Sequence, residues 1–242
     1  MIERQRLQVD AEEIAAVCYS PNSGDPVLSG IFLHGAGNSS KERGDTLCSE
    51  LAERGMRIIA FDFSGWGEST SRTPCSIQKR VLEASAIMER LVLPYGLPLA
   101  VLAFSMSGQV AIELLRTYGE AIRCIALFNP AIYDSKALAT PFGPEFSEII
   151  RCPGSWRSAG IGSAFEGYQG KTLLVKSQWD DVIPPGVFDL IARSTRANSL
   201  AELVVDAAHH QLGSFMNANP AIAAYMADVI VGQLASQAHE NS

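Results

Sequence analysis

A serine stands where an apolar run of the sequence changes into a helical pattern. Ser105 follows the run 101–104, and two small residues, Ala103 and Ser107, lie two positions before and after it. A nucleophilic serine on a sharp strand-to-helix turn needs such neighbours, because larger side chains would collide with adjacent backbone. Ser107 is the rival nucleophile, but the bulky Gln109 would then occupy a position that requires a small residue. We therefore prefer Ser105, with an ordinary helix-capping serine as the alternative.

Carboxylates and histidines that could activate this serine lie farther along the chain. A serine hydroxyl is a poor nucleophile at neutral pH, so a base must take its proton and a carboxylate must orient that base. Asp180 and Asp181 follow one apolar run, and His209 and His210 follow the next. The paired histidines could also be a fragment of a metal site. No third ligand has a suitable spacing, so we expect no metal.

The segments around these residues alternate apolar runs with longer helical patterns. Strands are expected at 27–33, 56–62, 99–104, 122–128, 172–176 and 202–206, and helices at 41–54, 78–93, 107–118, 186–194 and 220–234. Strands that are apolar throughout are covered on both faces, which predicts a parallel sheet between two layers of helices. The segment 6–19 alternates more strongly and is expected to form an antiparallel hairpin at the edge of the sheet.

One stretch lacks this alternation. The residues between Asn129 and Gly170 are rich in Gly, Pro, Ser and aromatic residues and have no clear period. A long irregular stretch inside a compact domain is usually a functional lid or a binding loop. We therefore expect a cap or lid at 130–169, inserted in a single domain that spans 1–242. A pair of poorly patterned helices packed on the sheet is the alternative.

Taken together, these segments resemble the α/β-hydrolase family over roughly 27–234. The serine segment is similar to the family's G-x-S-x-G turn, with Ala103 and Ser107 in the glycine positions, and the segment 62–69 matches the family's D-x-x-G-x-G-x-S loop. Nucleophile, acid and histidine follow in the family's order. The resemblance implies an α/β-hydrolase fold, with a mostly parallel sheet flanked by helices and a short cap. We interpret the loop 62–69 as scaffold.

The resemblance also selects the acid. The segment before Pro184 resembles the family's G-x-x-D-x-x-x-P pattern, with Ser177 in the glycine position. Asp180 stands four residues before Pro184 and therefore takes the role of the acid that orients the histidine. Asp181 is the nearby alternative, which we interpret as a solvated turn residue.

The base and the oxyanion hole follow in the same way. His209 comes after a strand and two small residues, where the family carries its base, and His210 is the second choice. The loop 34–37 is glycine-rich and ends an early strand, where the family places its oxyanion loop. A developing oxyanion needs two fixed backbone N–H donors, which by position are the amides of Ala36 and Met106. The alternative is an ordinary glycine-rich strand-to-helix turn.

Composition limits the classes of partner. The chain has 242 residues, of which 47% are hydrophobic and 19% charged. A charged share below the usual figure of about 25% indicates a large buried core. The net charge of −7 argues against a nucleic-acid partner, which requires a basic face. No apolar run reaches the roughly 18 residues of a membrane span, and the first residues lack a signal-peptide core. We expect a cytoplasmic monomer or homodimer with no membrane partner.

Together these features predict a serine hydrolase that cleaves small or medium carboxylic esters through an acyl-enzyme intermediate, without a cofactor. Aromatic residues of the cap and one beside the nucleophile are candidates for the acyl pocket: Phe104, Phe142, Phe146, Trp156, Phe165 and Tyr168. The alternative is that the cap aromatics only attach the cap to the sheet. Arg151 and Arg157 could meet a substrate carboxylate, with solvated side chains as the preferred interpretation.

Two other functions stay open at this point. A thioesterase or an acyltransferase would use the same triad. A catalytically silent binding protein of the same fold is the second alternative, because Ala103 and Ser107 replace the usual glycines beside the nucleophile.

Overall fold

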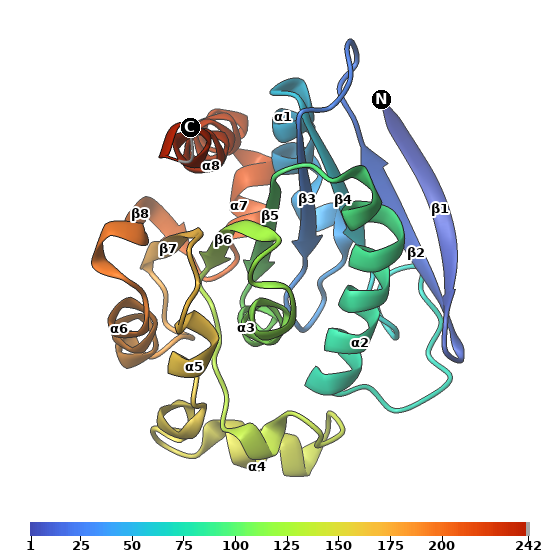
Figure 1. Ribbon diagram of the computed structural model, residues 1–242. Helices are drawn as coiled ribbons and strands as arrows, with labels where there is room; N and C mark the ends of the chain where they lie inside the picture. The colour runs from blue at the N-terminus through green and yellow to red at the C-terminus, as the bar shows by residue number, and fades with distance from the viewer. Residues whose placement is uncertain (241–242) are drawn as a thin grey trace.

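A mixed, mostly parallel sheet of eight strands forms the centre of the molecule (Figure 1). The computed structural model describes the backbone of residues 1–240 and the side chains of 1–235, so the last two residues of the expected domain 1–242 lie outside the described part. The strands are β1 Ile2–Val9, β2 Glu12–Tyr19, β3 Leu28–Leu33, β4 Met56–Phe61, β5 Leu99–Phe104, β6 Ile122–Phe128, β7 Lys171–Trp179 and β8 Leu200–His209. They lie in the order β1-β2-β4-β3-β5-β6-β7-β8.

The direction of the strands agrees with the apolar pattern. From β4 to β8 all neighbours pair in parallel, whereas β1 and β2 form an antiparallel hairpin and β2 pairs antiparallel with β4. The burial of β4 and β5 is complete, as expected for parallel strands covered on both faces. The expected hairpin at the sheet edge and the expected fold class are therefore confirmed.

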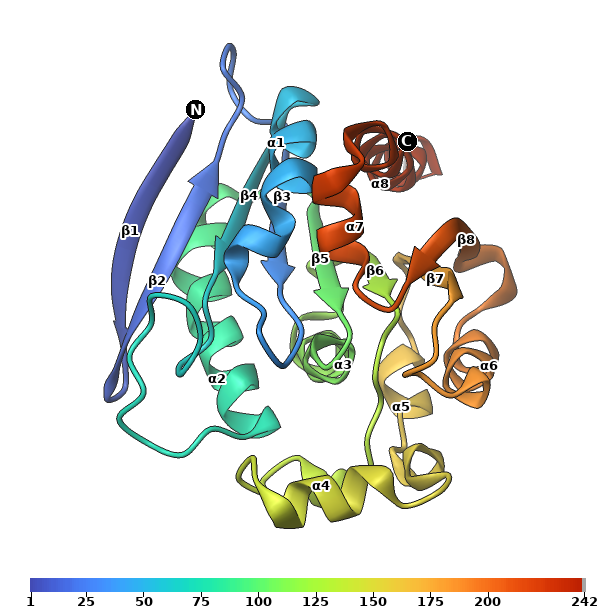
Figure 2. The ribbon, with the colours of Figure 1, turned by 180° about the vertical axis from the view of Figure 1, so that it is seen from behind.

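Helices cover both faces of the sheet (Figures 1 and 2). They are α1 Asp45–Glu53, α2 Ile77–Ile87, α3 Ser107–Tyr118, α4 Pro144–Arg151, α5 Gly162–Phe165, α6 Pro185–Ser194, α7 Leu212–Ala218 and α8 Pro220–Glu240, with short 3₁₀ helices at Lys41–Gly44, Leu93–Tyr95, Ser135–Ala137, Ser155–Ser158 and Ala197–Ser199 and a π turn at Met88–Val92. Helices α1, α7 and α8 pack on one face with one apolar cluster, and α2, α3, α5 and α6 pack on the other with a second.

Alternation along the central strands builds these two clusters. In β3, Ile31 and Leu33 face the cluster under α2 and α3, whereas Phe32 between them faces the cluster under α1 and α8. All three side chains are fully buried. The sheet therefore holds the carboxyl ends of β3 to β8 in fixed relative positions, and loops at these ends can carry a site.

The irregular stretch contains short helices. The segment 130–169 holds α4, α5 and the 3₁₀ helices Ser135–Ala137 and Ser155–Ser158. It leaves the carboxyl end of β6 and passes beyond the ends of the parallel strands (Figure 1). Its part as a cap or lid stays a prediction. Helix α7 had no counterpart among the expected elements, because its seven residues are too few for a clear helical period.

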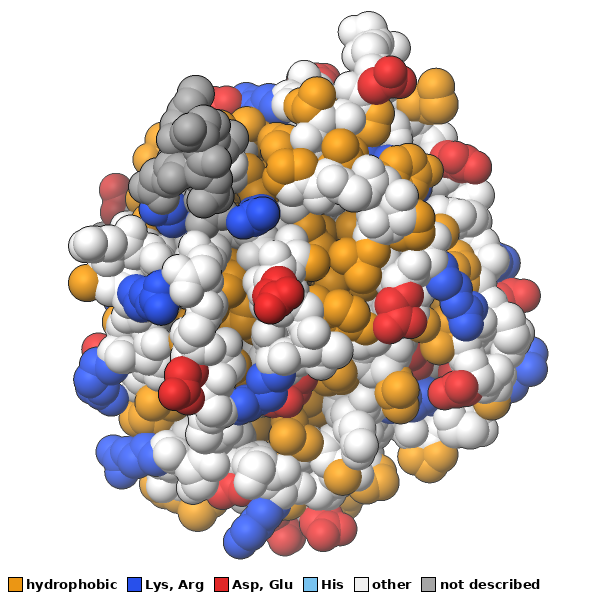
Figure 3. All heavy atoms as spheres, in the orientation of Figure 1, with side chains coloured by type: hydrophobic (Ala, Val, Ile, Leu, Met, Phe, Trp, Pro, Cys, Tyr) orange, Lys and Arg blue, Asp and Glu red, His pale blue; other side chains and the backbone are white. Residues whose placement is uncertain are grey.

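Among residues 1–240, no helix combines the length and the apolar character that are needed to cross a membrane. The face seen in Figure 3 carries acidic and basic side chains interspersed with apolar ones.

Candidate active site

The predicted nucleophile lies on a sharp turn between β5 and α3. Ser105 has a φ of 50°, a left-handed conformation that non-glycine residues rarely adopt. Its amide donates to the carbonyl of Phe128 (3.0 Å), and its carbonyl accepts from the amides of Gly108 and Ala131 (both 2.8 Å). A Cβ on Gly108 would lie 2.6 Å from the Cβ of Pro130, so this position requires glycine. The turn therefore places the Ser105 hydroxyl beyond the end of the sheet and holds its strained backbone by three hydrogen bonds.

The rival serine has another partner. The Ser107 side chain is fully buried, and its hydroxyl donates to the carbonyl of His34 (2.5 Å). It therefore lies against the glycine-rich loop after β3 and is not directed toward the histidines. This geometry agrees with the prediction that Ser105, and not Ser107, stands at the tip of the turn.

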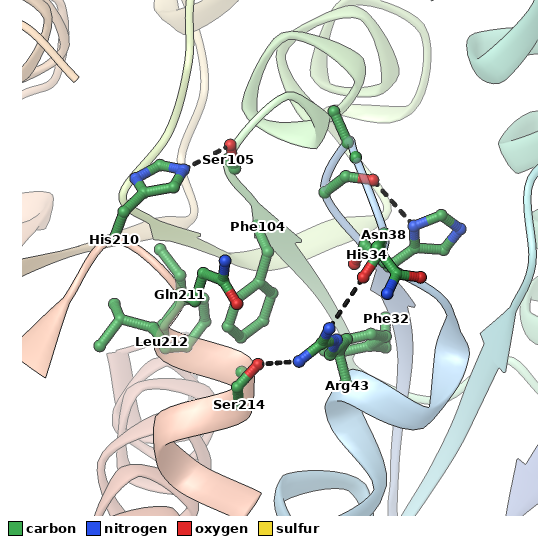
Figure 4. A pocket seen from close by; sticks show the side chains of 16 residues that line it. Phe32, His34, Asn38, Arg43, Phe104, Ser105, His210, Gln211, Leu212 and Ser214 are labelled. Atoms are coloured by element: carbon green, nitrogen blue, oxygen red, sulfur yellow. Dashed lines mark hydrogen bonds between the residues drawn. The ribbon is translucent and has the colours of Figure 1, made fainter. Parts of the chain in front are cut away.

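A chain of hydrogen bonds joins Ser105 to a histidine and a carboxylate. The Ser105 Oγ lies 2.9 Å from Nε2 of His210 (Figure 4), and Nδ1 of His210 lies 3.0 and 3.1 Å from the two oxygens of Asp180. Because the carboxylate accepts, Nδ1 carries the proton and Nε2 is free to accept from the serine. Asp181, the alternative acid, is exposed. This arrangement can take a proton from Ser105 and stabilise the imidazolium that results.

The structure corrects the choice of histidine. His209 was expected to face Ser105, but it is exposed and its ring lies 5.4 Å from that of Trp179. The cause is an irregularity in β8 at Ala207, which has a φ of 56°. Regular alternation from the buried Val205 would have turned His209 inward. β8 advances four residues from Val205 to His209 while β7 advances two, so Ala208 is buried instead and His210, the next residue but one, bonds Ser105.

Two buried polar residues hold the loop that carries the histidine. The Ser177 hydroxyl donates to the carbonyl of His209 (2.7 Å), and the Asn129 amide group donates to the carbonyl of His210 (2.9 Å). Asn129 and Ser177 also bind each other through side chain and backbone, at 2.7 and 2.8 Å. Ser177 was expected only to replace a glycine, and nothing in its sequence pattern predicts this contact. Asn129 had no expected role, because its only signal in the sequence is its place directly after β6.

The carboxylate that His210 contacts is kept ionised by its hydrogen bonds. The Asp180 side chain is only 4% exposed, and burial by itself would raise its pKa. Hydrogen bonds from His210 and from the amides of Val182 and Ile183 outweigh this effect and hold the pKa of Asp180 below its usual value. Asp180 is therefore a charged acceptor that fixes the orientation of the His210 ring.

The expected oxyanion donors lie beside the serine. The amides of Ala36 and Met106 have no protein acceptor within the described residues. The loop after β3 comes so close to the nucleophile that a Cβ on Gly35 would lie 3.2 Å from the Cβ of Ser105. Backbone amides without an acceptor, next to a serine that can act as a nucleophile, are suited to an oxyanion. Their part in catalysis stays a prediction.

A buried arginine supports the same loop from behind. Arg80 of α2 is 1% exposed, and its Nη1 donates to the carbonyl of Gly35 (3.2 Å). Its guanidinium carbon lies 4.2 Å from the ring centre of Trp66 and 4.5 Å from that of Phe63. Burial lowers the pKa of Arg80 to about 10, so the side chain is still charged at neutral pH. Its Nε and Nη2 find no acceptor in the described residues.

The histidine of this loop is a structural residue. His34 is fully buried; its Nε2 accepts from the amide of Phe63 (3.2 Å), and its Nδ1 donates to the carbonyl of Gly35 (2.8 Å). Burial, with the charge of Arg80 nearby, holds the pKa of His34 well below its usual value. A neutral His34 with both nitrogens bonded fixes the loop and takes no part in proton transfer.

The loop 62–69 was interpreted as scaffold. Its contacts are ion pairs and backbone hydrogen bonds that fix the shape of the loop. The buried Asp62 accepts from Nζ of Lys41 (2.6 Å), from the Lys41 amide (2.8 Å) and from the amide of Glu68 (2.9 Å). A Cβ on Gly67 would lie 2.2 Å from an Asp62 oxygen, so glycine is required there. The carboxylates of Glu42, Asp62 and Glu68 all contact the Lys41 ammonium, which supplies the positive charge between them.

A cavity of about 290 Å³ opens beside Ser105 (Figure 4). Three aromatic rings form one wall. Phe104 and Phe128 stack at 4.2 Å, and Phe32 lies 5.0 Å from Phe104. The other wall comes from the loop and the 3₁₀ helix after β3 and from the start of α7, and its polar side chains are Asn38, Ser39, Arg43, Gln211 and Ser214. The cavity can therefore hold an apolar group near the nucleophile and a polar one farther away.

Only one of the expected pocket residues lines this cavity. Phe104 does, whereas Phe142, Phe146 and Trp156 do not. Phe142 and Phe146 pack against each other at 4.8 Å, and Trp156 packs against Gly186. Phe165 and Tyr168 are buried, and Arg151 and Arg157 are exposed. These aromatic residues of the segment 130–169 thus pack within the segment and against the rest of the fold. Phe32, Phe128 and Arg43 were not expected here, because their three distant segments meet only through the order of the strands.

Comparison with known families decides the relationship. A family model described as "Serine aminopeptidase, S33" matches residues 26–154, which is more than half of the chain. The chain belongs to this family of α/β-hydrolases. The serine aminopeptidase match covers β3, the loop 62–69, the serine turn and residues 130–154, whereas Asp180 and His210 lie beyond it. No curated protein matches the sequence of this family member.

Solved structures share the fold of this serine aminopeptidase-family protein at low sequence identity. Est1E from Butyrivibrio proteoclasticus, with ferulic acid bound, is 14% identical with a TM-score of 0.75, covering 96% of this chain and 99% of that one. The esterase Pf2001 from Pyrococcus furiosus is 17% identical with a TM-score of 0.69, covering 97% and 93%. An α/β serine hydrolase homologue from Coxiella burnetii is 14% identical with a TM-score of 0.67, covering 92% and 96%. At these sequence identities the likeness concerns the fold alone.

Proposed function

We propose that the protein is a serine hydrolase that cleaves small or medium carboxylic esters, with Ser105 as nucleophile, His210 as base and Asp180 as the residue that orients the base. The observation that carries this proposal is the continuous chain of hydrogen bonds from the Ser105 hydroxyl through the His210 ring to the buried Asp180 carboxylate. A helix-capping serine would have no need of such partners.

Acylation begins with proton transfer. His210 Nε2 takes the proton of Ser105 as the serine oxygen forms a bond to the ester carbonyl carbon, and the carbonyl electron pair moves to the oxygen. The amides of Ala36 and Met106 donate to this oxyanion, and Asp180 stabilises the imidazolium. When the C–O bond to the alcohol breaks, His210 returns its proton to the leaving oxygen, and the acyl group stays on Ser105.

Deacylation repeats these steps with water. His210 takes a proton from a water molecule, whose oxygen attacks the acyl carbon. The second tetrahedral intermediate collapses when the bond to the Ser105 oxygen breaks and His210 protonates that oxygen. The carboxylic acid leaves, and the serine hydroxyl is restored. Both half-reactions need only groups of this chain and water.

The size of the cavity supports the choice of substrate. At about 290 Å³ it lies near the lower end of the range of ligand pockets, about 300–1,000 Å³. Its three phenylalanines suit an apolar acyl group of moderate size. Among proteins of the same fold are an esterase and a protein with ferulic acid, an aromatic carboxylic acid, bound.

Labelling with a fluorophosphonate probe tests the nucleophile. The wild-type protein is expected to label and the Ser105→Ala variant is not. Ser107→Ala serves as the matched control and should still label, because its hydroxyl binds the His34 carbonyl and not His210. An unlabelled wild type would favour a silent binding protein. Labelling that survives in Ser105→Ala but is lost in Ser107→Ala would contradict the assignment of the nucleophile.

A series of p-nitrophenyl esters tests the substrate class. We expect kcat/KM to be highest for short and medium acyl chains and to fall for long ones, because long chains exceed the cavity. A steady rise from acetyl to palmitoyl would contradict this. Thioesters and anilides of the preferred acyl group separate an esterase from a thioesterase and from an amidase, and faster turnover of either would overturn the ester assignment.

A further inference from the structure

The cavity beside Ser105 has a charge opposite to that of the chain. Among its described lining residues, Arg43 is the one side chain with a permanent charge, and no carboxylate lines it. The chain as a whole carries a net charge of −7. A concave site with low-dielectric aromatic walls concentrates the field of its own charge, so this cavity attracts anions in spite of the acidic surface.

Arg43 is held in place without being neutralised. Its Nη2 donates to the carbonyl of Asn38 (2.8 Å), and its Nη1 donates to the hydroxyl of Ser214 (Figure 4). These two acceptors are uncharged, and they occupy two of the five N–H groups of a guanidinium. Both come from elements that line the cavity, so the planar group is oriented before any ligand arrives.

The nearby carboxylates are engaged elsewhere. Glu42 contacts the Lys41 ammonium at 2.9 Å, and Asp45 accepts from the hydroxyl of Tyr19 at 2.5 Å. Within the described residues, Arg43 has no carboxylate partner. An arginine that is oriented, partly buried and lacks a counter-charge is suited to a carboxylate ligand, because its fork geometry matches two oxygens at once.

We propose that Arg43 binds a carboxylate at the far end of the acyl chain, so that the preferred substrates are monoesters of dicarboxylic acids. The inference rests on the proposed hydrolase function. The Phe104 ring lies between Ser105 and Arg43 in Figure 4, which calls for an apolar spacer between the scissile carbonyl and the terminal carboxylate. The acyl group is the part that stays bound through both half-reactions, so we place it in the cavity.

A matched pair of substrates measures this preference. The p-nitrophenyl monoester of adipic acid carries a terminal carboxylate, and p-nitrophenyl 6-methylheptanoate replaces that carboxylate by an isopropyl group of the same shape. The wild-type protein is expected to favour the acidic ester. In Arg43→Met the ratio of the two kcat/KM values should fall about 10- to 100-fold, mainly through KM, as expected for the loss of charge-assisted hydrogen bonds. Arg43→Lys should retain part of the ratio.

A second arginine provides the control. Arg54, at the end of α1, pairs with Glu50 and Asp228 and does not line the cavity. Arg54→Met removes the same charge from the chain and should leave the ratio of the two esters unchanged. A ratio that falls equally in both variants would mean that the net charge of the protein is responsible, and it would overturn the proposal.

Binding without turnover separates the two proposals. In Ser105→Ala, calorimetry with monomethyl adipate should show binding that disappears when Arg43→Met is added. If the wild type hydrolyses both p-nitrophenyl esters equally well and Arg43→Met changes nothing, the carboxylate site is refuted and the hydrolase stands. If neither ester is hydrolysed but binding depends on Arg43, the hydrolase assignment fails and the carboxylate site stands. Absence of both overturns both.

Discussion

Two arginines bind the loop that follows β3, one of them away from the cavity and one in its wall, and they differ in burial and in partners. Arg80 lies behind the loop, 1% exposed, between aromatic rings, with its Nη1 on the carbonyl of Gly35. Arg43 lies on the cavity side, half-buried, and donates to Asn38 and Ser214. One guanidinium is closed off by protein groups, and the other keeps N–H groups that face a space where a ligand fits.

The two arginines therefore differ in expected role: Arg80 supports the loop, and Arg43 is the residue that we propose binds a substrate carboxylate. A fully buried charge is tolerated only where its surroundings compensate for lost water, so Arg80 is bound up with the packing around it. A partly solvated charge at a cavity wall costs less to hold and less to remove. The loop that both arginines contact carries the Ala36 amide. Arg80 holds this loop in place, whereas Arg43 belongs to the wall of the cavity that the loop lines.

The largest expected effect tests whether His210, which lines the cavity, and not the exposed His209, is the base. His210→Ala removes the only imidazole bonded to Ser105 among the described residues and should lower kcat/KM at least about 10³-fold. His209→Ala, one residue away and exposed, should change kcat/KM by less than about threefold. Ester hydrolysis by purified variants of equal thermal stability measures both. The reverse order of effects would show that the histidine loop adopts another register.

The second prediction concerns the buried side. Arg80→Ala leaves a void among Phe63, Trp66 and Phe142 and should lower the free energy of unfolding by about 3 kcal/mol. Arg80→Met fills most of that volume and should keep the stability while lowering kcat about 10-fold, since the Gly35 carbonyl loses its donor and the loop its support. Denaturant unfolding and kcat measure the two effects.

Arg43→Met is the matching change on the other side of the loop. It should leave the free energy of unfolding within about 1 kcal/mol of the wild type, because the side chain is partly solvated and has no charged partner in the described residues. A loss of stability as large as that of Arg80→Ala would remove the distinction between the two arginines.

The third prediction concerns Glu12, near the edge of the sheet, which supports the segment before α2. Glu12 of β2 accepts from the Lys79 ammonium (2.8 Å) and from the amides of Arg72 and Thr73 (both 2.9 Å), and so holds the segment that leads into α2 and Arg80. Burial would raise the pKa of Glu12, but these hydrogen bonds lower it to about 2. A carboxyl whose pKa is lower in the folded state stabilises the fold above its unfolded pKa of about 4.5.

This stabilisation is therefore lost as the pH falls from about 4.5 to 2. Glu12→Gln should lower the free energy of unfolding by about 2 kcal/mol at pH 6, and the difference from the wild type should vanish near pH 2. Urea unfolding across this pH range measures it. A difference that does not depend on pH would mean that shape, and not ionisation, is what Glu12 contributes.

Much of this architecture could be predicted from sequence, and the failures have physical causes. Apolar runs located the strands, and the small residues around Ser105 located the turn, because both depend on local sterics. The choice between His209 and His210 depended on the bulge at Ala207, and a left-handed alanine leaves no trace in composition. The cavity wall could not be predicted either. Phe32, Phe128 and Arg43 belong to segments that meet only when the strand order is known.

The smallest expected effect tests which contacts hold the histidine loop in the conformation that directs His210 toward Ser105. Ser177 donates to the carbonyl of His209 and accepts from Asn129, which in turn donates to the carbonyl of His210. Ser177→Ala removes one of these supports and leaves the triad side chains unchanged, so we expect kcat to fall about fivefold with little change in KM. Ser177→Thr keeps the hydroxyl and should restore most of the rate. The fluorophosphonate labelling rate should follow kcat in both variants, because it reports the fraction of molecules in which His210 is bonded to Ser105. Equal rates in wild type and Ser177→Ala would mean that the bulge at Ala207 alone sets the register.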